Sequence, residues 1–169
     1  GVAAGAFIHN WIPKEFVVSL LGSRNPFGVI LAAVVGIPMY ADIFGCSHIR
    51  MFSFYAEPDK SPEENRDLVF TRMQAFFDRT PEGMFLCHEN EKHIYGETPG
   101  RCLELLRAFP RLRAVFDPAN FVQCGVDTLK AYDLIGDYIE YFHVKDAMFA
   151  DGSVVPAGEG EGNVVELLK

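Results

Sequence analysis

The chain has 169 residues, of which 49% are hydrophobic and 22% charged, so it is long enough to fold around a sizeable core. Its formal net charge of −8 leaves no basic surface for a phosphate backbone and disfavours nucleic-acid binding. The cysteines form no C-x-x-C pair, which favours reduced thiols in a cytoplasmic protein over disulfides or a structural zinc. These are Cys46, Cys87, Cys102 and Cys124.

Residues 1–44 differ in character from the rest of the chain. Their four charges balance to zero, so the whole net charge of −8 belongs to residues 45–169. Residues 25–41 form an uncharged run of 17, which is marginal for a membrane span of about 20 residues and equally compatible with a buried core segment. We therefore expect an apolar, mainly helical segment at 1–44, through which alone the protein would contact a membrane, and a separate domain at 45–169.

From Cys46 onward, strand and helix patterns alternate. Serine, proline and glutamate at 61–64 predict the start of a helix, and the glycine-rich loop at 156–162 predicts a flexible lid. The pattern predicts parallel strands in about four βα units, an α/β fold equal to half of a (β/α)₈ barrel of about 250 residues. The expected strands are 47–55, 84–87, 112–116 and 138–142, and the expected helices are 61–78, 98–109, 126–135 and one from Val164.

Three of these strands are each followed by a side chain that can bind a metal, namely Glu89, Asp117 and His143. They are 28 and 26 residues apart, close to the roughly 31 residues per unit of a barrel whose strands all end at one mouth. Two carboxylates favour Mg²⁺ or Mn²⁺, and one imidazole extends the choice to Co²⁺ or Zn²⁺. The alternatives are a surface carboxylate at Glu89, a turn or cap at Asp117 and a core histidine at His143.

Four further residues are candidates for substrate binding. The amide of Asn120 would face a substrate oxygen or cap a helix. Lys145 is also a candidate catalytic residue, because its ammonium would meet a substrate hydroxylate or phosphate. Asp146 would orient a neighbouring group and Arg50 would reach the barrel interior, although surface or structural ion pairs explain the charged residues equally well.

Three motifs carry a family resemblance: LCHENEKHIYG at 86–96, FDPANFVQCG at 116–125 and FHVKD at 142–146. Through them, residues 46–169 resemble the sugar phosphate isomerase/epimerase family with the xylose-isomerase-like TIM barrel. The resemblance implies that Glu89, Asp117 and His143 are three of four metal ligands and that Glu89 is also an acid/base carboxylate. The implied reaction removes a proton next to the carbonyl of a small sugar or sugar phosphate, passes through an enediolate held by the metal, and returns the proton to another carbon or the other face.

The sequence also departs from the family pattern. The fourth ligand of the family is a glutamate on the last strand, whereas this sequence ends at Lys169 in the preceding helix, and the first three strands are absent. Residues 1–44 resemble part of a predicted membrane permease family, so a recombined, misassembled or engineered chain would explain both departures. We expect a metal-dependent isomerase/epimerase domain impaired by truncation, whose open sheet edges favour self-association. The alternatives are a permease fragment and a sugar-binding barrel without turnover.

Overall fold

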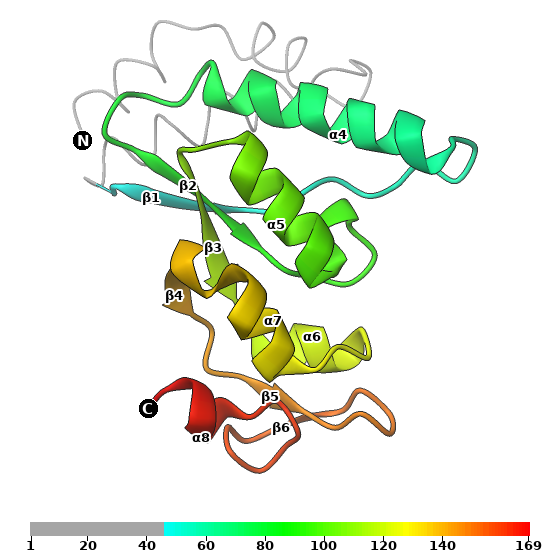
Figure 1. Ribbon diagram of the computed structural model, residues 1–169, viewed down its shortest axis with the longest axis vertical. Coiled ribbons are helices and arrows are strands. Elements are labelled where there is room, and N and C mark those ends of the chain that lie inside the picture. The colour runs from blue at the N-terminus through cyan, green and yellow to red at the C-terminus, as the bar shows by residue number, and fades with distance from the viewer. Residues whose placement is uncertain (1–45) are drawn as a thin grey trace, which may run out of the picture. The chain divides into compact units, whose positions relative to one another are not determined.

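The computed structural model describes residues 46–169 (Figure 1). The expectations for residues 1–44, including the permease-like segment, lie outside the described residues. No helix within 46–169 is long and apolar enough to cross a membrane. The chain divides into two compact units, and the site described below lies wholly in the unit made of 50–78 and 85–169.

Four strands form one sheet whose spatial order follows the chain order. They are β1 (His48–Met51), β2 (Phe85–Glu89), β3 (Leu112–Phe116) and β4 (Ile139–Phe142). β3 is parallel to β2 and to β4, with Glu89 opposite Val115 and Phe116 opposite Phe142, so the carboxyl ends of these three strands are level. The expected α/β fold with parallel strands is confirmed.

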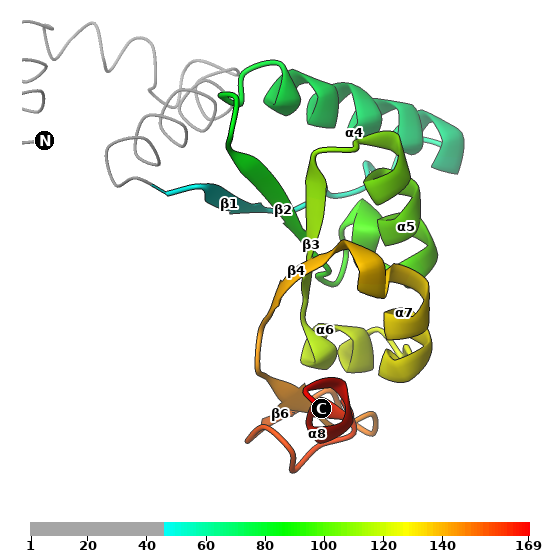
Figure 2. The ribbon, with the colours of Figure 1, turned by 60° about the vertical axis from the view of Figure 1, so that its left-hand side comes forward.

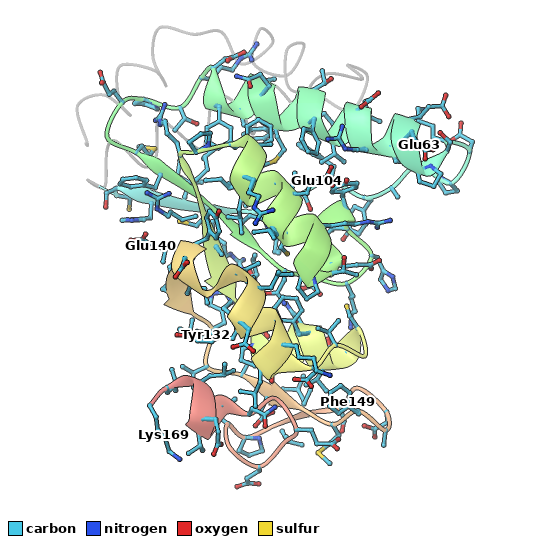
Figure 3. The ribbon with its side chains drawn as sticks, viewed as in Figure 1. Glu63, Glu104, Tyr132, Glu140, Phe149 and Lys169 are labelled. Atoms are coloured by element: carbon cyan, nitrogen blue, oxygen red, sulfur yellow. The ribbon has the colours of Figure 1, made fainter. Side chains whose placement is uncertain are left out.

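Three helices lie on one side of the strands (Figure 2): α4 (Pro62–Phe77), α5 (Pro99–Ala108) and α7 (Thr128–Ile135). The capping box predicted for α4 is present, because the amide of Glu64 donates to Ser61 Oγ at 3.2 Å and the amide of Ser61 donates to Glu64 Oε2 at 2.9 Å. On α5, the carboxylate of Glu104 (labelled in Figure 3) accepts from Arg66 of α4 and from the hydroxyl of Tyr95. These polar contacts join α5 to α4 and to the turn that carries Tyr95.

The core lies between the strands and these helices. Phe116 of β3 and Phe121 are both fully buried, and their ring centroids are 5.0 Å apart in an edge-on arrangement. Leu105 of α5, Leu112 of β3 and Met73 of α4 are also fully buried. Each such side chain contributes about 1.5–3 kcal/mol through removal of apolar surface from water. The strand ends that carry polar side chains are therefore held by a packed apolar layer.

The structure differs from the sequence-based expectation in several places. β1 ends at Met51 rather than at residue 55, and beyond it Tyr55 forms an isolated antiparallel bridge with Ile94. The patterns did not predict two short 3₁₀ turns, one helix and a two-stranded hairpin. These are η1 (Tyr95–Glu97), η2 (Gly136–Tyr138), α6 (Pro118–Gln123), and β5 (Asp146–Ala147) with β6 (Val154–Val155). The helix predicted from Val164 is present as the short α8 (Val164–Leu167).

Candidate metal centre

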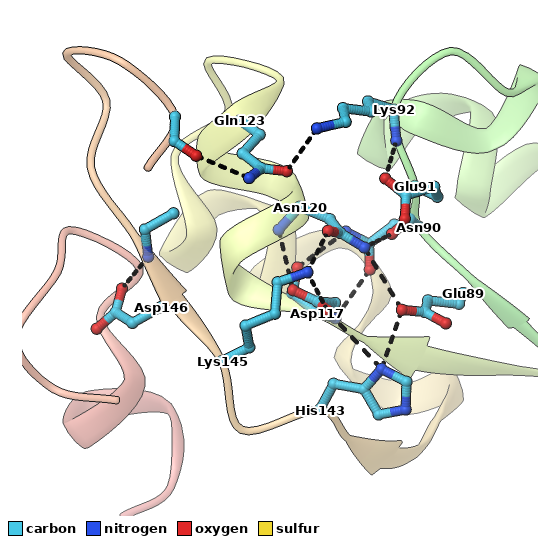
Figure 4. A network of polar contacts seen from close by, with 12 residues as sticks. Glu89, Asn90, Glu91, Lys92, Asp117, Asn120, Gln123, His143, Lys145 and Asp146 are labelled. Atoms are coloured by element: carbon cyan, nitrogen blue, oxygen red, sulfur yellow. Dashed lines mark hydrogen bonds and ion pairs between the residues drawn. The ribbon is translucent and has the colours of Figure 1, made fainter. Parts of the chain in front are cut away.

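The three predicted ligands converge at the carboxyl ends of adjacent strands (Figure 4). Glu89 is the last residue of β2, Asp117 follows β3, and His143 follows β4. One ligand atom from each lies within 4.8 Å of the other two. His143 Nδ1 is 2.9 Å from Glu89 Oε1 and 3.7 Å from Asp117 Oδ2. The three side chains therefore converge, as their spacing along the sequence predicted.

The chemistry of these donors fits a divalent cation. Glu89 is 3% exposed and Asp117 is 1% exposed, so two carboxylates that would repel each other are buried side by side. Burial raises the pKa of the Asp117 carboxyl above its usual range, although the amide of Asn120 and the ammonium of Lys145 act in the opposite direction. A cation would balance the two charges, and the half-buried imidazole of His143 would complete three of its ligands.

Asp117 divides its two carboxylate oxygens between two tasks. Oδ1 accepts the amide of Asn120 at 2.9 Å and so caps the N-terminus of α6, while Oδ2 faces His143 and Lys145. The turn or cap that the sequence offered as an alternative to a ligand is therefore present at the same residue. The two interpretations of Asp117 are compatible.

The structure also brings Arg50, Asn120 and Lys145 to this cluster. Arg50 Nη1 donates to Glu89 Oε2 at 2.5 Å, and Lys145 Nζ lies 3.2 Å from Asp117 Oδ2 and donates to Asn120 Oδ1 at 2.7 Å. The side-chain Nδ2 of Asn120 in turn donates to Glu89 Oε1 at 3.4 Å. Their predicted roles in substrate binding and catalysis stay predictions, but all three residues are at the predicted mouth.

Asp146 was grouped with these residues by the sequence and is the exception. Its buried carboxylate points away from the triad, as Figure 4 shows, and accepts four backbone N–H groups. Three of them belong to Gly158, Gly160 and Gly162, so the glycine-rich loop expected to be a flexible lid is anchored to Asp146 instead. The substrate-binding role predicted for Asp146 finds no support in this geometry.

Sequence reasoning missed Asn90. Its side chain is 1% exposed and hydrogen-bonds both backbone polar groups of Asp117, which joins the ends of β2 and β3. An asparagine directly after a strand-end glutamate was the available signal. It was passed over because asparagine is common in ordinary loops.

Within residues 46–169, the other histidines and the cysteines lie outside the cluster. His88 is buried, its Nε2 lies 2.9 Å from Ser53 Oγ, and burial lowers its pKa to about 4. His93 is exposed in a left-handed backbone conformation. All four cysteines are free, as expected. Burial raises the pKa of the Cys102 thiol to about 12.

Comparison with known proteins identifies the fold family. A family model described as "Xylose isomerase-like TIM barrel" matches residues 31–169. The chain belongs to the xylose isomerase-like TIM barrel family. The match begins within the segment 1–44, and the boundary between 1–44 and 45–169 stays a prediction. The comparison reports nothing on a permease. No curated protein matches the chain.

Solved structures of this family share the fold at low sequence identity. A xylose isomerase domain protein from Planctomyces limnophilus has a TM-score of 0.70 at 21% identity, over 84% of this chain and 54% of that one. The probable 3-DHS dehydratase AsbF from Bacillus anthracis gives 0.68 at 17%, over 98% and 74%. D-allulose 3-epimerase from Methylomonas sp. in complex with D-allulose gives 0.57 at 18%, over 78% and 51%. The chain thus spans about half the length of the first and third of these proteins, a partial TIM barrel.

Proposed function

We propose that this chain carries a metal-dependent isomerase or epimerase domain that acts on a small sugar or sugar phosphate by proton transfer through an enediolate. The observation that carries the proposal is the convergence of Glu89, Asp117 and His143 within 4.8 Å at the carboxyl ends of three strands. A bound divalent cation, Mn²⁺, Mg²⁺, Co²⁺ or Zn²⁺, would supply positive charge where the substrate oxygen becomes negative.

In this proposal Glu89 moves the proton as well as binding the metal. In an isomerisation it takes a proton from the carbon next to the substrate carbonyl and returns it to the former carbonyl carbon, while the hydroxyl proton passes to the former carbonyl oxygen. An epimerisation would need a second acid on the other face of the same carbon to supply the new proton. Oε2 of Glu89 is held by Arg50, whose side chain is 47% exposed and can therefore also reach a ligand at the mouth. Asn120 and Lys145 would hold the oxygens of the sugar, or a phosphate, from the β3 and β4 side.

Metal binding by the whole chain tests the site directly. Titration calorimetry with Mn²⁺ should show one site in the wild type and a loss of at least about tenfold in affinity in Glu89→Gln and in His143→Ala. Glu91→Gln is the matched control, because Glu91 lies two residues beyond Glu89 and its carboxylate accepts the amide of Lys92. Equal Mn²⁺ affinity in all four proteins would contradict the assignment of the ligands.

A sugar-binding barrel without turnover is the competing proposal, and proton exchange separates the two. D-allulose is a suitable first probe, because a protein of similar fold has been solved in complex with it. In D₂O with Mn²⁺, the wild type should replace a C–H next to the carbonyl with deuterium, and Glu89→Gln should not. Binding of the sugar without exchange would favour the competing proposal.

Three broader predictions remain. We infer that the domain works in the cytoplasm, and that the alternative permease-like role belongs to residues 1–44. Self-association is expected because, among the described strands, β1 and β4 have a sheet neighbour on one side only. Sedimentation velocity should show a mass that rises with protein concentration, and a monomer at every concentration would contradict it.

A further inference from the structure

The buried carboxylate of Asp146 is satisfied by backbone N–H groups. Oδ1 accepts the amides of Ala147 at 2.9 Å and Gly162 at 2.8 Å, and Oδ2 accepts those of Gly158 at 3.0 Å and Gly160 at 3.1 Å. The residue is 0% exposed, and no lysine, arginine or histidine within 46–169 lies in ion-pair distance of it. A buried carboxylate is stable only when its lone pairs are occupied, so these four bonds are strong constraints.

The loop that supplies these donors can approach so closely because it consists largely of glycine. A Cβ at Gly160 would lie 2.4 Å from Asp146 Oδ1, and a Cβ at Gly162 would lie 2.7 Å from the same atom. Gly158 has a φ of +87°, which favours glycine. The glycines at 158, 160 and 162 therefore match the carboxylate that they surround, and we call Asp146 with these three residues the Asp146 latch.

The latch lies next to the residues of the candidate metal centre. The amide of His143 donates to the carbonyl of Phe116 in the sheet, and the amide of Lys145 donates to the carbonyl of His143 in a tight turn. Asp146 follows directly. The segment 143–145 is thus fixed to the sheet at one end and to the glycine loop at the other. Without the second attachment, the segment would lose the backbone bonds that the loop makes with Asp146.

The same latch also reaches the helix that begins at Asp117. A Cβ at Gly162 would lie 3.0 Å from Pro118 Cβ, so the loop packs against the first residue of α6. Ala147, beside Asp146, is buried in one apolar cluster with Ala119 and Val122 of α6. The latch therefore connects the segment that carries His143 with the helix that carries Asn120.

We propose that Asp146 is a positioning residue: its latch sets the place of His143 and Lys145 relative to Asp117, and so sets the affinity of the site for its cation. This inference rests on the proposed function for the metal, while the placement of His143 can be observed without any metal. In this proposal the carboxylate acts through the glycine loop and not through direct contact with the cation or the substrate.

The test compares Asp146→Asn with the wild type. Asparagine has the same shape but offers an NH₂ group to two of the backbone donors, so it cannot satisfy all four. The amides of 158, 160 and 162 should exchange with solvent about tenfold faster, and the imidazole NMR signals of His143 should shift in metal-free protein. The Mn²⁺ affinity should fall about tenfold while unfolding stays cooperative. Asp151→Asn is the matched control, because exposed Asp151 on the same hairpin accepts one amide, that of Ser153.

A second variant keeps the proposal falsifiable. Gly160→Ala leaves the carboxylate intact and displaces the loop sterically, so it should reproduce the effects of Asp146→Asn. The proposal is overturned if the loop amides exchange faster while the imidazole NMR signals of His143 keep their wild-type positions and the Mn²⁺ affinity stays within about twofold of wild type. Loss of cooperative unfolding in both variants would also overturn it, because the latch would then support the whole fold. A wild type that binds no Mn²⁺ refutes the proposed function alone, since the His143 signals still report on the latch.

Discussion

Asn90 and Asp117 are joined by two reciprocal hydrogen bonds. The backbone N–H of Asp117 donates to Oδ1 of Asn90, and Nδ2 of Asn90 donates to the carbonyl oxygen of Asp117, both at 2.9 Å. Asn90 also accepts at its own carbonyl from the side chain of Asn120, at 2.8 Å. Because Asn90 directly follows Glu89, these bonds hold the end of β2 that carries Glu89 beside the end of β3 that precedes Asp117.

Asn90→Ala should therefore destabilise the protein by about 1–3 kcal/mol, because it leaves the buried N–H of Asp117 without its partner. The carbonyl of Asp117 loses one of its two donors and keeps the backbone N–H of Phe121 at 3.3 Å. Urea unfolding of the metal-free protein measures the change. Gln74→Ala removes an amide from the surface of α4, where it donates to Asp78, and should change stability by less than about 0.5 kcal/mol. Similar values for the two variants would show that the reciprocal pair contributes little.

Lys145→Met should bind Mn²⁺ about threefold to tenfold more tightly than wild type, because the ammonium competes with the cation for Asp117 Oδ2. The lysine side chain is 36% exposed, so solvent screening keeps the gain at this modest level. Calorimetry at constant ionic strength measures it, with Lys130→Met as control, since Lys130 is 83% exposed and pairs with Asp127. Weaker Mn²⁺ binding in Lys145→Met would mean that the lysine supports the site by a different route.

His88 should make stability depend on pH. Its pKa is about 4 in the folded protein against 6.5 ordinarily, so the folded state binds fewer protons than the unfolded state between these values. The stabilisation is fully present above pH 6.5 and is lost as the pH falls towards 4, by about 3 kcal/mol in total. Urea unfolding with chelator at pH 7, 6, 5 and 4 should show a flatter profile for His88→Gln than for wild type. Parallel profiles for the two proteins would refute the assignment.

Gly96→Ala should cost about 2–3 kcal/mol, because the added methyl would lie 2.4 Å from Cε1 of buried His88 and 2.9 Å from Ser53 Oγ. Gly100→Ala is the matched control. Nothing lies within 4 Å of its Cβ position at the start of α5, so alanine should stabilise the helix by about 0.5–1 kcal/mol. Thermal unfolding of both variants measures the contrast. Equal effects would show that the pocket around Gly96 is adaptable.

The sequence predicted the elements whose signals are local. The capping box at Ser61 and the apolar period after it predicted α4, and the buried apolar runs predicted β2, β3 and β4. α6 was missed because it has only six residues and five of them are buried, so it shows no polar face. The hairpin β5–β6 was missed because two-residue strands are too short for an alternating pattern.

The candidate site likewise contains residues whose positions the sequence predicted and residues whose positions it did not. The convergence of the three candidate ligands was predicted because parallel strands end at one edge, so position along the chain translates into position in space. Asp146 follows Lys145 in sequence but is turned away from the triad, because adjacency in sequence does not fix the direction of a side chain. Successive side chains of an extended segment point to opposite sides, and Lys145 faces Asp117 while Asp146 faces the glycine loop. The part played by Asn90 depends on a pairing across strands, which no local pattern encodes.

The divided carboxylate of Asp117 restricts which residues this position accepts. Asparagine would keep the cap on α6 but would remove a negative charge from the metal side. Glutamate would keep the charge, but its longer side chain would carry both oxygens away from the amide of Asn120. Charge and reach are fixed by different neighbours, so aspartate alone meets both requirements. A redesign of the metal preference of this site therefore has more freedom at Glu89 and His143 than at Asp117.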